Sequence, residues 1–380
     1  MVSHPVGRLS RAVRDGSGEP SYGVMKRLLN GASNPMTDVT ELLVALVDRR
    51  DLDGGQMRAL MTALMAGRCA EAETAALLVA LHMKGETAAE LATAAAVLRE
   101  HMVVLETGRD DVLDTCGTGG DGAGTVNVST MAAIVTAASG ARVAKHGGRA
   151  ASSKCGSVDV LESLGVVIDL GPEGVSRCVR EVGIGFCFAQ RFHPAMRFAA
   201  PVRRELGTPT TFNFLGPLAN PAGASRRTVG VSDPVMAERV IRTLATLGVE
   251  RALVFFGHDG LDELTVTTTS TVYELEHGAV RIYDIDPLDV GIPRADLGAL
   301  AGGDAAGNAQ AVHQVFAGAK GPIRDIVRLN AAAALLAADV VPDLATGVDL
   351  AAELIDDGRA AATLEAFVRV SVAARESGVG

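Results

Sequence analysis

The fold of this chain is decided by the stretch Asp114-Thr-Cys-Gly-Thr-Gly-Gly-Asp-Gly-Ala-Gly-Thr-Val-Asn-Val-Ser-Thr130. It follows a short apolar run, Val112-Leu113, and leads into a small-residue segment that is expected to be helical from about Ser129. A strand, a glycine turn and a helix N-terminus in this order form an anion site. Glycines allow backbone N–H groups to converge on phosphate oxygens, and the helix dipole adds positive potential. Polar side chains along the turn add donors and oxygens suited to a metal ion; they are Thr118, Thr125, Asn127, Ser129 and Thr130.

Neither of the common phosphate-binding fingerprints fits this turn. A P-loop requires Lys followed by Ser or Thr after its last glycine, and no such pair follows here. A dinucleotide-binding turn requires G-x-G-x-x-G directly before a helix, whereas Gly122 is followed by more glycine and Thr. By itself the turn is equally consistent with a tight structural loop.

A second cluster, Lys145-His-Gly-Gly-Arg-Ala-Ala-Ser-Ser153, follows another apolar run at Ala141-Arg-Val-Ala144. It holds two cations, two glycines and two hydroxyls at the expected carboxyl end of a strand, where open α/β sheets bind ligands. A capped helix is expected to begin at Ser157 or Asp159. Two such units about 30 residues apart favour phosphate binding over a pair of solvated loops.

Further motifs follow in a fixed order. They are Val182-Gly-Ile-Gly-Phe-Cys-Phe-Ala189, Phe192-His-Pro-Ala-Met196, Pro201-Val-Arg-Arg-Glu-Leu-Gly207, Phe212-Asn-Phe-Leu-Gly-Pro-Leu-Ala-Asn-Pro221 and Gly260-Leu-Asp-Glu-Leu264. With the two clusters above, this set resembles the anthranilate phosphoribosyltransferases, from about Thr37 to the end of the chain. The resemblance implies transfer of the 5-phosphoribosyl group from phosphoribosyl pyrophosphate (PRPP) to the amine of anthranilate. The products would be N-(5-phosphoribosyl)anthranilate and pyrophosphate, in tryptophan biosynthesis.

The resemblance also assigns the residues of the site. PRPP is expected to contact Gly117, Gly120, Asp121, Thr125, Asn127, Val128, Ser129, Thr130, Lys145, His146, Gly147, Arg149, Ala150, Ala151, Ser152, Ser153 and Ser157. Two Mg²⁺ ions are expected per active site, held by Ser129, Asp262 and Glu263. Anthranilate or a related aminobenzoate is expected to contact Gly117, Gly148, His193 and Arg203. From the residues alone, Arg203 and Arg204 are not distinguishable as the carboxylate-binding arginine, and His193 is equally consistent with a structural histidine turned by Pro194.

Two positions depart from the family pattern. Position 148 is Gly where the family has an Asn that contacts the acceptor, and position 190 is Gln where Pro is usual. These changes leave a paralogous enzyme of secondary metabolism, acting on a substituted aminobenzoate or benzoate, as an alternative. A pyrimidine nucleoside phosphorylase-like enzyme is a second alternative, and Mg²⁺ dependence would discriminate against it. A nucleic-acid-binding homologue is a third, which the net charge disfavours.

Composition limits the classes of partner. The chain has 380 residues, a net charge of −10 and no dense basic run, so binding to nucleic acid or to a membrane surface is not expected. Five cysteines without a C-x-x-C pair, together with no signal peptide, predict reduced thiols and a cytoplasmic location. The sequence has no run of about 18 apolar residues, so no transmembrane helix is predicted.

The chain is expected to have an α/β fold with a small N-terminal α-helical domain and a larger domain built on a mainly parallel sheet. Residues 1–36 read as a flexible tail, residues 37–108 carry helical periodicity, and residues 109–380 alternate apolar runs with glycine-rich loops and helices. A helix near 194–208 is expected to pack back onto the helical domain. One of the expected strands covers Thr265–Tyr273. The helical domain is predicted to form a homodimer through apolar surface that includes Met57, Leu60, Met61, Leu64 and 75–81.

Overall fold

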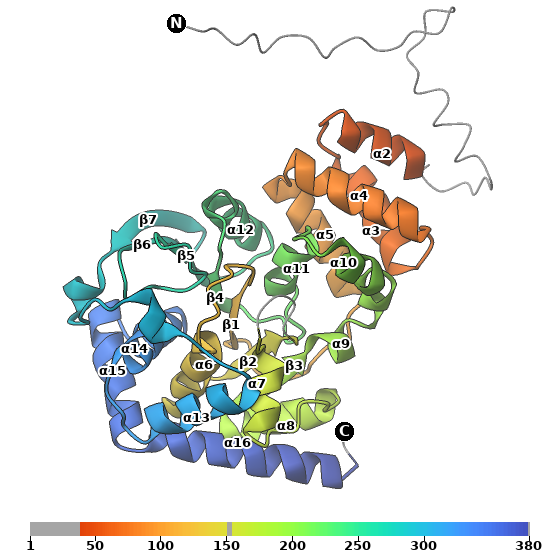
Figure 1. Ribbon diagram of the computed structural model, residues 1–380. Helices are drawn as coiled ribbons and strands as arrows, with labels where there is room; N and C mark the ends of the chain where they lie inside the picture. The colour runs from red at the N-terminus through yellow and green to blue at the C-terminus, as the bar shows by residue number, and fades with distance from the viewer. Residues whose placement is uncertain (1–38, 150–153, 379–380) are drawn as a thin grey trace, which may run out of the picture.

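The computed structural model describes residues 39–149 and 154–378, and a bundle of helices begins the described chain (Figure 1). The bundle contains α2 (Val39–Val47), α3 (Gly54–Met65), α4 (Glu71–Lys84) and α5 (Ala88–Glu100). Thr87 caps α5 by accepting from the backbone N–H of Glu90, whose side chain accepts in turn from the N–H of Thr87. The predicted helical domain and this capping box are therefore confirmed. The caps predicted at Thr37 and Asp38 lie outside the described residues.

A single mixed sheet forms the larger unit, in the order β3-β2-β1-β4-β5-β6-β7. Its strands are β1 (Leu113–Gly117), β2 (Val143–Gly147), β3 (Ile184–Phe188), β4 (Arg226–Gly230), β5 (Arg251–Gly257), β6 (Ser270–Glu276) and β7 (Ala279–Ile285). The first five in space pair in parallel, and β6 and β7 pair antiparallel at one edge. The sheet is thus mainly parallel, as predicted, and the carboxyl ends of β1 and β4 lie side by side.

The strand predicted over Thr265–Tyr273 was wrong at its start. β6 begins only at Ser270, and the preceding residues form a loop. In that loop the hydroxyls of Thr265 and Thr267 both donate to Oδ2 of Asp259, at 2.6 and 2.5 Å. Threonine favours strands on average, but here a local carboxylate competes for its hydroxyl and bends the backbone.

Helices cover both faces of the sheet (Figure 1). α6 (Val128–Ala138) and α14 (Pro322–Ala337) pack on one face, and α11 (Phe212–Leu218) and α12 (Pro234–Thr246) on the other. The remaining elements are α7 (Ser157–Ser163), α8 (Pro172–Val182), α9 (Ala189–Phe192), η1 (Pro194–Phe198), α10 (Ala200–Leu206), η2 (Pro287–Val290), η3 (Leu297–Leu300), α13 (Ala305–Phe316), α15 (Leu344–Asp356) and α16 (Arg359–Glu376). α10 contacts α4, as predicted for the helix near 194–208. Among the described helices, none is both long and apolar enough to cross a membrane.

The apolar core divides by sheet face rather than by domain. One cluster fills the space between the sheet and α6 and α14. The other runs without a break from the helical bundle onto the opposite face, through Leu215 of α11 and Val254 of β5. Met57, Leu60, Met61 and Leu64 belong to this second cluster and are at most 2% exposed, as are the leucines of α4. The expectation that these residues supply dimer surface was wrong, because they are buried where the helices of the bundle pack on one another, α3 against α5 and α4 against α2.

Candidate active site

The glycine-rich loop after β1 folds against the turn that carries Asp262. The backbone N–H of Gly119 donates to Oδ2 of Asp262 at 2.7 Å. A Cβ at Gly117 would lie 2.4 Å from the same oxygen, and a Cβ at Gly230 would lie 1.6 Å from the Asp262 carbonyl oxygen. Glycine is therefore required at the ends of both strands, because any side chain there would push the 262 turn away. These glycines allow the Asp262 turn to approach the strand ends closely, and the glycine-rich backbone is also suited to binding an anion.

The carboxyl group of Asp262 interacts here with those of Asp121 and Glu263. Burial raises the pKa of Asp262 to about 7, and the neighbouring Asp121 contributes to that rise. Burial also raises the pKa of Glu263 well above its usual value, with Asp262 as the next cause. Crowded carboxylates of this kind are stabilised as anions by a bound cation, so the donor set fits Mg²⁺.

The described residues do not by themselves form a complete metal site. Within residues 39–149 and 154–378, no three His, Cys, Asp or Glu side chains are grouped closely enough to form a complete metal site. Mg²⁺ normally keeps waters and binds through one or two carboxylates plus substrate phosphates. Asp121 adds a third carboxylate to the two predicted from the sequence.

Lys145 supplies a buried cation beside these carboxylates. Its side chain lies in β2 with a relative exposure of 2%, and Nζ donates to the carbonyl of Thr115 at 2.5 Å and to Oγ of Ser129 at 3.2 Å. Burial lowers the pKa of Lys145, and nearby acidic groups, Glu263 and Asp262 among them, oppose that effect. The backbone N–H of Ser129 also favours the charged form of Glu263. The structure thus brings together Lys145, Ser129 and Glu263, although these residues are separated along the sequence.

The far end of the glycine loop is held by a segment that sequence reasoning missed. Thr125 forms an antiparallel bridge with Ala301, and Nδ2 of Asn308 donates to Oδ1 of Asn127 at 2.8 Å. Asn308 lies in α13, 181 residues from Asn127. No motif marks it, because a lone amide in an alanine-rich helix carries no sequence signal. Val128 and Thr130 are buried in the first turn of α6, directly after this clamp.

Two buried histidines lie on the other side of Lys145. The rings of His146 and His193 are tilted, with centroids 4.9 Å apart. His146 donates its backbone N–H to Oδ1 of Asp114 at 3.0 Å. Burial lowers the pKa of His146 to about 4 and that of His193 to about 3, so both rings are neutral near pH 7. Neutral imidazoles suit the wall of an aromatic pocket better than an anion site.

Gly148 opens space at the end of β2. A Cβ built there would have Ala189 Cβ, at 3.9 Å, as its nearest neighbour among the described residues. By contrast, a Cβ at Gly147 would lie 3.1 Å from the Phe186 ring. Position 147 is therefore restricted by packing, whereas position 148 accepts a side chain.

The structure separates Arg203 from Arg204. Arg204 is exposed, whereas Arg203 is half-buried in α10 and burial lowers the pKa of its guanidinium. Arg203 Cζ lies 5.4 Å from the centroid of the Phe212 ring, and Nη2 donates to Oδ1 of Asn213 at 3.3 Å. A planar guanidinium held in this way keeps donors for a carboxylate.

The remaining predicted residues fall into two groups. Arg149 is exposed and its guanidinium pairs with Asp159 and Glu162 of α7, at 3.0 and 2.8 Å, so its donors face protein carboxylates in this state. Ser157 is the first residue of α7 and lies beside Gly147. The other predicted contacts of this loop, Ala150, Ala151, Ser152 and Ser153, lie outside the described residues.

Comparison with known proteins agrees with this geometry. Residues 109–361 match the model of the glycosyl transferase family a/b domain, and residues 40–102 match that of its helical bundle domain. The anthranilate phosphoribosyltransferase of Chloroflexus aggregans is 52% identical over 337 residues, covering 88% of this chain and 98% of the relative. The chain belongs to the anthranilate phosphoribosyltransferase family.

Solved members of the anthranilate phosphoribosyltransferase family share the fold. The crystal structure of the Thermus thermophilus enzyme has a TM-score of 0.82 and 44% identity, covering 87% of this chain and 99% of its own. The Saccharomyces cerevisiae enzyme, solved in complex with PRPP and Mg, also has a TM-score of 0.82, at 25% identity, and covers 90% of this chain and 100% of its own. The family predicted from the motifs is confirmed, and with it the enzyme class, a glycosyltransferase.

Proposed function

We propose that this enzyme transfers the 5-phosphoribosyl group of PRPP to the amine of anthranilate, with Mg²⁺, as a step of tryptophan biosynthesis. The products are N-(5-phosphoribosyl)anthranilate and pyrophosphate. The observation that carries the proposal is the meeting of Asp121, Asp262 and Glu263 with the glycine loop and buried Lys145. We infer from this arrangement a site for a magnesium-bound, highly charged phosphate ester. The yeast relative that was solved with PRPP and Mg supports the same assignment.

In the proposed reaction the bond from ribose C1 to pyrophosphate breaks as the bond to the amine nitrogen forms, and the amine releases a proton. Negative charge grows on the leaving group, so stabilisation of that charge lowers the barrier. Bound Mg²⁺, with two ions proposed per site, would neutralise part of this charge. The backbone N–H groups of the glycine loop and of the first turn of α6 add fixed donors for phosphate oxygens. Asp262 and Glu263 would hold the metal, whose positive charge would stabilise the two crowded carboxylates as anions.

The acceptor is proposed to bind on the opposite side of β2. The half-buried Arg203 would pair with the carboxylate of anthranilate, and the neutral ring of His193 would line the aromatic pocket. The sequence resemblance places His146 among the PRPP contacts, but its neutral ring lies beside that of His193, and we propose that it lines the same pocket. The open space at Gly148 favours a second candidate acceptor class, the ring-substituted aminobenzoates.

A direct test follows pyrophosphate release by the purified protein with PRPP, Mg²⁺ and a panel of aminobenzoates. Anthranilate should support turnover, and chelation of divalent cations with EDTA should stop it until Mg²⁺ is restored. Release with another benzoate but not with anthranilate would overturn the acceptor and keep the phosphoribosyltransferase class. Turnover of nucleosides with inorganic phosphate, without Mg²⁺, would indicate a phosphorylase instead.

We also propose a homodimer through the helical bundle and a cytoplasmic location. Because Met57 and its neighbours are interior, the dimer proposal rests on the apolar side chains that remain exposed on α2 and α4: Val44, Val47 and Met83. None of the five cysteines, all of which the structure describes, forms a disulfide, in keeping with a reducing compartment.

A further inference from the structure

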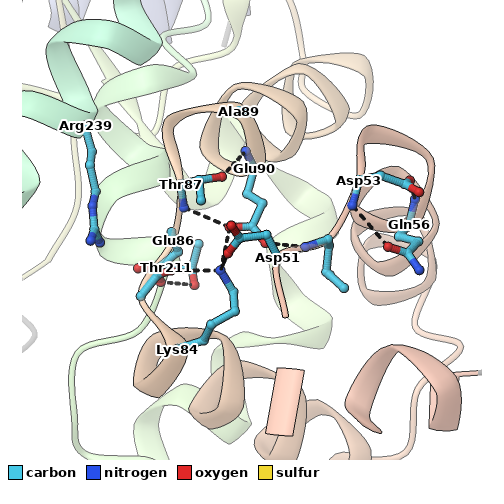
Figure 2. Close-up of polar contacts among 12 residues, drawn as sticks. Asp51, Asp53, Gln56, Lys84, Glu86, Thr87, Ala89, Glu90, Thr211 and Arg239 are labelled. Carbon is cyan, nitrogen blue, oxygen red and sulfur yellow. Dashed lines mark hydrogen bonds and ion pairs between the residues drawn. The ribbon is translucent and has the colours of Figure 1, made fainter. Parts of the chain in front are cut away.

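The turn between α4 and α5 is held rigidly by a buried ion pair (Figure 2). Lys84 Nζ donates to Oε2 of Glu90 and to Oδ1 of Asp51, both at 2.8 Å. Glu90 is 1% exposed and also accepts from the backbone N–H groups of Leu52 and Thr87, each at 2.8 Å. Both oxygens of this carboxylate are therefore used in fixing the chain on either side of the turn.

This turn presents Glu86 to the α/β unit. Glu86 is 2% exposed, and its Oε1 accepts a hydrogen bond from Oγ1 of Thr211 at 2.5 Å. Thr211 is 1% exposed and lies 125 residues further along the chain. Figure 2 shows the two side chains meeting next to the Lys84 network. A short hydrogen bond between two buried side chains defines the relative placement of the two segments.

Thr211 stands at the start of α11, and the two residues that follow it hold Arg203. The carbonyl of Thr211 accepts from the backbone N–H of Phe214 at 3.0 Å, so the threonine belongs to the first turn of the helix. Phe212 lies under the guanidinium of Arg203, and Asn213 accepts from it. Oδ1 of Asn213 also accepts from the N–H of Thr210 at 3.0 Å, which fixes the amide.

We propose that Glu86 is a positioning residue for the acceptor arginine. It anchors Thr211, and through the first turn of α11 it sets where Phe212 and Asn213 hold Arg203. The inference rests on the proposed role of Arg203 in binding the anthranilate carboxylate. It assigns a function in acceptor binding to a residue of the helical bundle that acts through Thr211, and it makes the bundle part of acceptor recognition.

The decisive variants keep or remove the hydrogen bond with little change of shape. Thr211→Val replaces the hydroxyl by a methyl group, whereas Thr211→Ser keeps it. Glu86→Ala removes the acceptor, and Glu86→Gln keeps an acceptor oxygen. We expect Thr211→Val and Glu86→Ala each to raise the KM for anthranilate about tenfold, with the KM for PRPP within about twofold of the starting value. Thr211→Ser and Glu86→Gln should restore the KM for anthranilate to within about threefold.

A matched control is Thr243→Val, which removes another buried hydroxyl that reaches the helical bundle. Thr243 Oγ1 donates to the carbonyl of Arg239 at 2.7 Å and to that of Ala88 at 3.3 Å, but it has no part in holding Arg203. It should lower the thermal midpoint without a selective effect on the KM for anthranilate. If Glu86→Ala does not fold, the isosteric Thr211→Val decides the question. If Glu86→Ala folds, the double variant with Thr211→Val should show no further rise in the KM for anthranilate beyond that of either single variant.

Arg203→Lys separates failure of this inference from failure of the proposed function. An unchanged KM for anthranilate in Arg203→Lys would overturn the assignment of the carboxylate-binding arginine, and the positioning role with it. A raised KM in Arg203→Lys with no effect in Thr211→Val and Glu86→Ala would overturn the positioning role alone. Equal losses for both substrates, in step with the thermal midpoint, would show that the hydrogen bond only stabilises the fold.

Discussion

The backbone N–H of Gly119 donates to the carboxylate of Asp262 across 2.7 Å, although the two residues are 143 positions apart. This bond joins the glycine loop that follows β1 to the acidic turn that follows β5. The loop proposed to bind phosphate and the residues proposed to bind the metal are therefore directly connected. A change in either should disturb both.

Replacement of Gly117 tests this coupling. In Gly117→Ala the new Cβ would lie 2.4 Å from Asp262 Oδ2, so the turn must move. We expect kcat/KM to fall about 100-fold or more, because small misplacements of binding groups are costly. Steady-state kinetics and thermal unfolding measure the two effects. As a control, Gly298→Ala, where a Cβ meets nothing within 4 Å, should leave the activity unchanged.

Removal of the two acidic residues tests the metal assignment. The double variant Asp262→Ala, Glu263→Ala should fold and lose turnover, because several kcal/mol of transition-state stabilisation depend on the metal. Its thermal midpoint without Mg²⁺ should equal or exceed that of the parent, since burial disfavours both carboxylates in the folded state. Near-normal activity at saturating Mg²⁺ would contradict the assignment.

Gly148→Asn tests the acceptor pocket. The side chain has room, and an amide would offer one or two hydrogen bonds to the acceptor, each worth about 0.5–1.5 kcal/mol. We expect a lower KM for anthranilate, an almost unchanged KM for PRPP, and poorer use of ring-substituted anthranilates than in the parent enzyme. An equal change in both KM values would place Gly148 in the phosphate site instead.

Acid stability should depend on the two buried histidines. The unfolded chain takes up these protons below about pH 6.5, but the pKa of His146 in the folded protein is about 4 and that of His193 about 3. Between pH 6.5 and about 4 the unfolded state therefore binds more protons. The free energy of unfolding should fall on acidification, by at most about 1.4 kcal/mol per pH unit for each histidine.

Thermal or urea unfolding across this pH range checks the effect. His146→Gln and His193→Gln should each have a shallower dependence on pH than the parent, whereas replacement of the exposed His313 by Gln should not alter it. An unchanged slope in both buried-site variants would show that other groups cause the acid sensitivity.

The proposed dimer predicts a mass near twice that of the 39.1 kDa chain at micromolar concentration. The double variant Val47→Glu, Met83→Glu should shift the protein toward monomer, because burying a charge in an apolar contact is unfavourable. These two side chains are 51% and 69% exposed in the single chain. Light scattering after gel filtration measures both masses. A monomeric parent would count against the dimer, and a dimeric variant would place the contact elsewhere.

The local sequence was sufficient for the elements that local chemistry controls. Thr87 and Glu90 form the capping box that their spacing predicts, and the glycines of 117–124 follow an apolar strand and precede a helix, as the sequence predicts. The order of the motifs was sufficient for the family. Even so, local preference failed at Thr265, where a carboxylate that lies close in space redirected a residue with strand propensity.

Only the tertiary structure decided which distant groups share a site. Asp121 joins Asp262 and Glu263 because β1 and β4 are adjacent and two glycines allow the close approach. Arg203 is distinguished from Arg204 because α10 turns only one of them inward. The methionines of α3 were expected on a surface but are core, since α5 and its neighbours in the helical bundle pack against them. Spacing along a chain reports periodicity and caps, whereas burial and long-range pairing depend on which faces meet once the whole chain has folded.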